Sequence, residues 1–137
     1  MDTVYLHCHI ADNGFLLVSK IPAKVCVCDP SPGIEIYAYK APVYSVSEGK
    51  VQRVFSIGGS TVMMIRNGDM YYIYGDLTQA NIKEGDTIHT NDCVGDMEKE
   101  SSGLYRLNFQ VWKQKHRKRG EPVTDEEMMA VLQGIKK

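Results

Sequence analysis

The stretch GLYRLNFQVW, residues 103–112, predicts a β-strand whose two faces differ in chemistry. Side chains alternate across a strand, so its apolar and polar residues fall on opposite faces. The face that would line a core carries Tyr105, Leu107, Phe109 and Val111. The other face carries Arg106, Asn108 and Gln110, which we call the polar row, with Trp112 at its end. The polar row is either ordinary solvated sheet, with its charges neutralised there, or the wall of a site.

The length and composition predict a single domain, residues 1–137, that buries a core without metal or disulfide staples. Apolar residues make up 43% of the chain, and the formal charge of -1 indicates no particular partner. No apolar run reaches the roughly 18 residues that span a bilayer. The N-terminus also lacks the basic start and apolar run of a signal peptide, which favours the cytoplasm over export.

Turn signals recur about every ten residues, a spacing typical of an all-β sandwich or barrel. They are ADNG, DPSPG, SEGK, IGGS, RNGD, KEGD and NDCVGD. The clearest hairpin is VMMIRNGDMYYIYG, residues 62–75, in which Asn67-Gly68 would supply the positive φ values of a type I′ turn.

The C-terminal segment, residues 124–136, predicts a short helix. Thr124 and Glu127 have the spacing of a capping box, with Thr124 as the N-cap. Acidic residues in the first turn and Lys136-Lys137 at the end suit the helix dipole. Met128, Leu132 and Ile135 fall on one face, so the helix is expected to pack on the sheet.

Four stretches, taken together and in order, share the motifs of one known protein family. SPGIEIYAYKAPVYSVSEGKV, residues 31–51, is similar to the family's opening His-x-Gly-[Ile/Val]-Asp and its Pro-Val-x-Ala-x-x-x-Gly-x-Val. DMYYIYGDLTQANIKEGDTIHTNDCVGD, residues 69–96, is similar to Tyr-x-x-Tyr-x-His-Leu, then Val-x-x-Gly-Asp-x-Val and a closing Ile-Gly. GLYRLNFQV stands in place of the His-Leu-His-Phe-Glu-Val strand, and EPVTD is similar to the Pro-Val-[Asn/Asp]-Pro exit. Together the four stretches resemble the LytM-like zinc peptidases of family M23, which cut peptide cross-links in bacterial cell walls.

This resemblance implies a mainly β fold: an antiparallel β-sandwich or barrel-sandwich hybrid of the M23/LytM type with a short C-terminal helix. The LytM-like core would run from residue 31 to residue 124. Its β frame would be the one called the duplicated hybrid motif. That β frame also resembles lipoyl and biotinyl carrier domains, but no lysine lies in their modification context at a hairpin tip. Family analogy suggests export, so the compartment stays open.

The resemblance also implies where the peptidase residues would fall. In the family a His and an Asp of the opening segment and the second His of the last strand hold zinc, while two further His act on water and the transition state. The chain has Ser31, Glu35, Asp76, Arg106 and Asn108 at these five positions. Arg106 is a cation that would repel a metal, and neither Arg nor Asn handles the proton of a zinc-bound water.

We therefore expect a pseudo-peptidase without catalytic residues, metal or cofactor, which acts as a binding or regulatory module for a peptide or protein. Glu35, Asp76 and Arg106 are expected to converge as carboxylate–guanidinium pairs. The candidate ligand groove of this binding module comprises Ser31, Glu35, Asp76, Arg106, Asn108 and Gln110. The aromatic residues considered as walls of the groove are Trp112, Tyr74 and Tyr44.

Two alternatives stay open, a metal-binding protein and a structural subunit of a larger assembly. The metal site would use His7, His9, Cys26 and Cys28, if their two strands pair. Against it, the spacing of the four cysteines, which include Cys8 and Cys93, favours reduced and partly buried thiols.

The basic run KQKHRKRG, residues 113–120, predicts a solvated loop and not a nucleic-acid site. The oligomeric state is left open.

Overall fold

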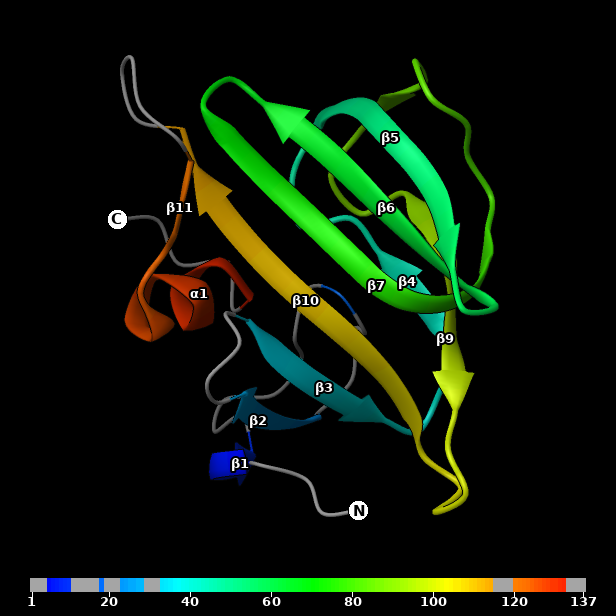
Figure 1. Ribbon diagram of the computed structural model, residues 1–137, viewed down its shortest axis with the longest axis vertical. Helices are drawn as coiled ribbons and strands as arrows, with labels where there is room; N and C mark the ends of the chain where they lie inside the picture. Colours follow the sequence, from blue (N-terminus) through cyan, green and yellow to red (C-terminus); the bar gives the residue numbers. More distant parts are fainter. Residues whose placement is uncertain (1–4, 11–17, 19–22, 29–32, 115–119, 133–137) are drawn as a thin grey trace.

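The computed structural model describes residues 5–10, 18, 23–28, 33–114 and 120–132. Within these residues the chain forms strands and one short helix, as Figure 1 shows. The strands are β1 (Tyr5–Ile10), β2 (Lys24–Cys28), β3 (Ile34–Ala38), β4 (Pro42–Tyr44), β5 (Gly49–Ile57), β6 (Ser60–Asn67), β7 (Met70–Ala80), β8 (Thr87–Ile88), β9 (Cys93–Lys99), β10 (Tyr105–Lys113) and β11 (Glu121–Pro122). The helix is α1 (Asp125–Leu132), which is too short to cross a membrane, and no other helix lies within the described residues.

All strand pairs within the described residues are antiparallel and belong to one sheet, in the order β1-β2-β3-β10-β9-β7-β6-β5-β8. Strand β10 is central, because it pairs with β3 along one edge and with β7 along most of the other (Figure 1). Asn108 accordingly lies between Glu35 of β3 and Gly75 of β7. These pairings confirm the mainly β, antiparallel fold, and they make β10 the floor on which a site can be built.

The inner face of β10 lies in the hydrophobic core, as the alternating pattern predicts. Leu107, Phe109 and Val111 are fully buried, and Tyr105 packs against the same cluster. The Phe109 ring meets the ring of Tyr74 edge-on, with 5.1 Å between the ring centroids. The polar row therefore lies on the opposite, outer face of the sheet.

Tyr74 is a core residue, so the expectation that it forms a wall of the groove is wrong. Its side chain is fully buried, and its hydroxyl accepts a hydrogen bond of 3.0 Å from the backbone N–H of Val46. Burial in this apolar environment raises the pKa of Tyr74 to about 12. The sequence did not show which face of β7 lies in the core, because both faces of this strand carry aromatic or aliphatic side chains.

The predicted hairpin is confirmed, but its turn lies one residue further along the chain. Asn67 remains in β6 and pairs with Met70, so the two loop residues are Gly68 and Asp69. The positive φ, 61°, falls on Gly68.

The capping box of α1 is also confirmed. The backbone N–H of Glu127 donates to Oγ1 of Thr124 at 3.1 Å, and the N–H of Thr124 donates to Oε1 of Glu127 at 3.2 Å. Met128 and Leu132 are buried in the core cluster, so the helix packs on the sheet as expected. Ile135 and the two terminal lysines lie outside the described residues.

Candidate functional site

Trp112, Gln110 and Asn108 form a hydrogen-bonded line along the outer face of β10, and Arg106 is the next residue on that face. The indole Nε1–H of Trp112 donates to Oε1 of Gln110 at 2.8 Å, and Nε2 of Gln110 donates to Oδ1 of Asn108 at 3.4 Å. All four side chains are half-buried. The line is thus more ordered than a row of freely solvated side chains would be.

At one end of this line, Arg106 lies among four carboxylates that come from three strands and the segment after β9. We call these five residues the Arg106 cluster. Nη1 of Arg106 is 3.4 Å from Oε2 of Glu35, and Nη2 of Arg106 is 3.6 Å from Oδ2 of Asp76. The other two contacts are Nη2 to Glu98 at 3.3 Å and Nε to Glu100 at 3.2 Å. The predicted convergence of Glu35, Asp76 and Arg106 is confirmed.

The charges of the Arg106 cluster do not balance, since one guanidinium faces four carboxylates. Burial alone would lower the pKa of Arg106, but Glu35, Asp76 and Glu100 outweigh it and raise the pKa above its usual value. Arg106 Nε is buried and lies close to Glu100, yet it makes no hydrogen bond of good geometry to any described residue. The other two nitrogens do donate, Nη1 to Oε2 of Glu35 at 3.4 Å and Nη2 to Oε1 of Glu98 at 3.3 Å.

Tyr37 joins the cluster through Glu35, and the sequence reasoning missed it. The Tyr37 hydroxyl donates to Oε1 of Glu35 at 2.9 Å. Burial, together with this carboxylate, raises the pKa of Tyr37 well above its ordinary value. Strand alternation could have identified Tyr37, because it lies two residues after Glu35 and so shares its face.

Asp76 reaches the outer face of the sheet through an irregularity in β7. Tyr74 and Leu77 are both fully buried although they are three residues apart, so the regular alternation is broken between them. Asp76 has a φ of 60°, a conformation that non-glycine residues adopt rarely and Asp more readily than most. This local backbone conformation allows its carboxylate to face Arg106 on the outer side of the sheet.

The described residues around Arg106 do not fit a zinc ion. Zinc is bound by imidazole, thiolate or carboxylate, whereas a guanidinium carries only hydrogen-bond donors and a positive charge. Both oxygens of Glu35 are engaged, Oε1 by Tyr37 and Oε2 by Arg106. Across the part of the chain that the structure describes, no group of three or more His, Cys, Asp or Glu side chains is placed to hold a metal. Ser31 lies outside the described residues.

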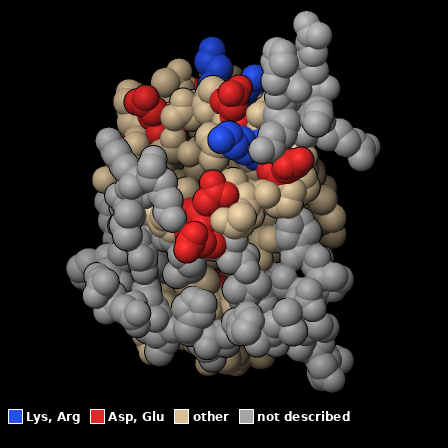
Figure 2. Space-filling view, turned by 90° about the vertical axis from the view of Figure 1, so that its left-hand side faces the viewer, with Lys and Arg blue, Asp and Glu red and all other residues tan. Residues whose placement is uncertain are grey.

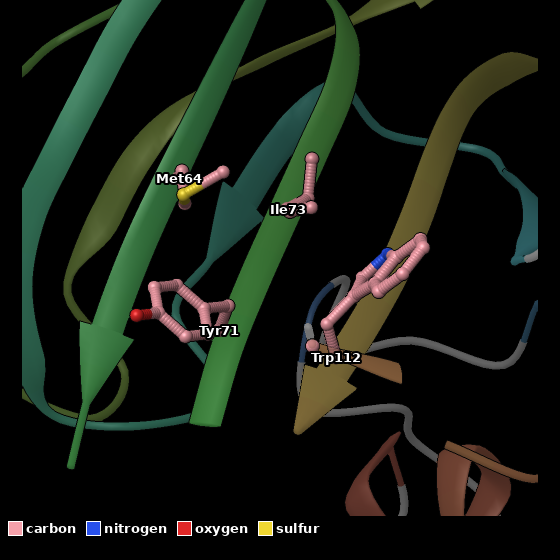
Figure 3. A pocket seen from close by; sticks show the side chains of 5 residues that line it. Met64, Tyr71, Ile73 and Trp112 are labelled. Carbon is pink, nitrogen blue, oxygen red and sulfur yellow. The ribbon is translucent and has the colours of Figure 1, made fainter. Parts of the chain in front are cut away.

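Beyond the other end of the polar row lies an open pocket of about 510 Å³ (Figure 3). Its described lining residues are Met64 of β6, Tyr71 and Ile73 of β7, Trp112 of β10, and Gly120. Trp112 therefore lines a pocket next to the polar row, whereas Tyr44 lies in β4 and is not among these lining residues.

The second predicted site, at the N-terminal strands, loses support from its backbone register. Strands β1 and β2 do pair, but His7 lies opposite Val27 and His9 opposite Val25, while Cys26 lies opposite Cys8. Cys26 is disulfide-bonded, so the expectation of a reduced thiol is wrong for this residue. A sulfur in a disulfide is not the thiolate that binds zinc.

Most of the basic run falls outside the described residues, so its prediction as a solvated loop is not tested. Figure 2 shows the side of the molecule that lies on the left in Figure 1. On that side the described Lys and Arg side chains are interspersed with Asp and Glu. The described part of this face therefore has mixed charge.

The chain belongs to peptidase family M23, whose family model matches residues 29–123. A mutant catalytic domain of EnpA, a prophage-encoded M23 protein from Enterococcus faecalis, superposes with a TM-score of 0.56 at 19% identity, over 87% of this chain and 87% of that chain. The catalytic domain of lysostaphin, an antimicrobial peptidase from Staphylococcus simulans, gives 0.54 at 16% identity, over 93% and 92%. CbpA from L. salivarius REN gives 0.52 at 17% identity, over 62% of this chain and 57% of that chain.

At these identities the structural matches show the fold alone. A search of curated proteins found no match. The family and the fold inferred from the four sequence stretches are thus confirmed.

Proposed function

We propose that this M23 domain does not hydrolyse peptides and instead binds an extended peptide segment along the outer face of β10. One observation carries the proposal: the Arg106 guanidinium lies 3.4 Å from Glu35 and 3.6 Å from Asp76. By the resemblance, all three occupy positions of zinc ligands or catalytic His in the active peptidases. A zinc hydrolase needs a metal to activate water and an acid/base to move its proton. At the two His positions of the last strand, the Arg106 cation repels a metal, and neither Arg106 nor Asn108 moves that proton.

The neighbouring polar row has the chemistry to hold a peptide backbone. Asn108 and Gln110 offer both donors and acceptors, and neither brings a charge that a partner must neutralise. Nδ2 of Asn108 donates no hydrogen bond to a described residue, so it can serve a ligand. Along most of its length β10 is paired on both sides, which prevents a peptide from adding to its edge as another strand. The peptide must therefore be held by side chains from above the sheet.

We expect the double substitution Asn108→Ala with Gln110→Ala to abolish peptide binding with little effect on folding. The probe is a displayed library of random twelve-residue peptides, selected on the immobilised wild-type protein and then measured as single labelled peptides. Affinity should fall at least tenfold, since both amide groups are lost, while the melting temperature changes by only about 2 °C because the two side chains are half-buried.

A matched control is Gln79→Ala with Asn81→Ala. This pair is also a Gln and an Asn two residues apart, joined by a 3.4 Å hydrogen bond, but it is exposed and outside the groove. The control should bind peptides like the wild type. A groove variant that melts much earlier but still binds the same peptides would mean that the row is structural.

A further inference from the structure

The pocket next to the polar row is built from apolar side chains of three neighbouring strands. In the sheet register Trp112 lies opposite Tyr71, Gln110 opposite Ile73, and Ile73 opposite Met64. Figure 3 shows the four labelled side chains on β6, β7 and β10 around one space. The pocket is therefore a continuation of the face that carries the polar row, and a ligand lying along β10 would reach it.

The pocket wall is held in place by the polar row itself. The 2.8 Å hydrogen bond from Trp112 to Gln110 fixes the orientation of the indole ring. On the opposite wall, the Arg66 guanidinium lies over the Tyr71 ring, 5.2 Å from its centroid. A pocket with ordered walls loses less conformational entropy when it is filled, which favours binding of a single apolar side chain.

The two ends of the groove differ in chemistry. The Arg106 cluster carries an excess of negative charge, and Asp76 and Glu98 remain 34% and 39% exposed. Trp112 lies six residues beyond Arg106 on β10, which corresponds to about 20 Å at ~3.3 Å per residue. This separation exceeds the length of a typical small ligand and matches an extended peptide of about seven residues.

We propose that the groove binds an extended peptide that puts a large aliphatic or aromatic side chain into the Trp112 pocket. A Lys or Arg of the same peptide, about six residues away, would face the Arg106 cluster. The pocket supplies the apolar anchor, and charge complementarity selects a basic residue over an acidic one at the far end. This inference rests on the proposed function, because it specifies the peptide that the same groove would take.

The composition of library peptides selected on the wild-type protein provides the first test. Enriched sequences should share a Leu, Ile, Met or Phe and a Lys or Arg about six positions apart. The chain contains a single tryptophan, so a selected peptide without Trp should shift the emission of Trp112 on binding. Selected peptides that bind through Asn108 and Gln110 but are acidic, or leave the Trp112 emission unchanged, would overturn this inference and leave the proposed function intact. A library with no binders would overturn both.

Variants at the two ends give the second test. Met64→Ala and Trp112→Ala should each weaken binding of a labelled selected peptide about tenfold, and Met64→Ala serves as the check if the tryptophan variant folds poorly. The double substitution Glu98→Gln with Glu100→Gln should weaken peptide binding by a similar factor and make the affinity less dependent on salt. Exchanging the peptide's basic residue for Ser should make binding insensitive to the Glu98 and Glu100 changes. Sensitivity that persists with the Ser peptide would contradict a direct charge contact.

Discussion

Replacing Arg106 with alanine should lower the free energy of unfolding by about 2–3 kcal/mol at neutral pH. The loss is that large because four carboxylates, one of them only 12% exposed, would be left without a cation. It stays below the cost of breaking a fully buried ion pair, because the Arg106 side chain is 25% exposed and solvent screens part of the charge. Urea denaturation of the wild type and the variant measures the difference.

Lys99→Ala provides a matched loss of one positive charge on an exposed residue of β9, next in the chain to the cluster residues Glu98 and Glu100. It should change stability by less than about 0.5 kcal/mol. Arg106→Lys keeps the positive charge but lacks the planar guanidinium. Its loss of unfolding free energy should lie between those of Arg106→Ala and Lys99→Ala. An Arg106→Ala variant as stable as the Lys99 control would show that the cluster contributes nothing to the fold.

The direction of the Arg106 pKa shift fixes where pH affects its own contribution. The folded-state pKa is raised, so the stabilisation is fully present below the unfolded-state value and is lost only as the pH rises beyond it. Both pKa values lie far above neutral pH, so titration of Arg106 itself gives no pH dependence in the neutral range.

Gly33→Ala is expected to cost about 3 kcal/mol of unfolding free energy, as the sum of backbone strain and a steric clash. Gly33 has a φ of 107°, which L-residues rarely adopt. An added Cβ would lie 2.6 Å from Cγ of Gln110 and 2.8 Å from the carbonyl oxygen of Phe109. Because the carbonyl belongs to the central strand, the clash cannot be relieved by a side-chain rotation alone. Denaturant unfolding gives the magnitude.

Gly103→Ala separates the two contributions to the Gly33 effect. Gly103 has a similar φ of 94°, but a Cβ there would meet no atom within 4 Å. Its substitution should cost only about 1 kcal/mol, the strain alone. The clash at Gly33 should also displace Gln110 and thereby change the emission of its neighbour Trp112. Equal costs at both glycines, with unchanged emission, would contradict the contact between Gly33 and β10.

The alternation of β10 could be predicted from sequence because it depends only on neighbours within one strand. Leu107 and Phe109 lie in the core, and Arg106 and Asn108 face outward, as their spacing requires. Where both faces of a strand are apolar, this rule gives no answer. Tyr74 and Trp112 were both considered as groove walls, yet one is in the core and the other lines the pocket.

The composition of the Arg106 cluster depends on strand register, which local patterns do not determine. The family resemblance predicted that Glu35 and Asp76 lie near Arg106, and both carboxylates contact it in the structure. Glu98 was missed because only the pairing of β9 with β10 sets it opposite Arg106. Glu100 was missed for the same reason, since it follows β9 directly. The N-terminal metal hypothesis required a register that aligns His with Cys, and the actual pairing sets His7 and His9 opposite valines.

Zinc content per chain is the most direct test of the central proposal, that a protein cation has replaced the metal of the peptidases. The protein is purified without chelator, equilibrated with a small excess of zinc, freed of unbound metal and analysed for zinc and sulfur. We predict far less than one equivalent of zinc per chain, and the same low value for the Glu35→Gln variant. One equivalent in the wild type that disappears in Glu35→Gln would place zinc in the groove and contradict the account.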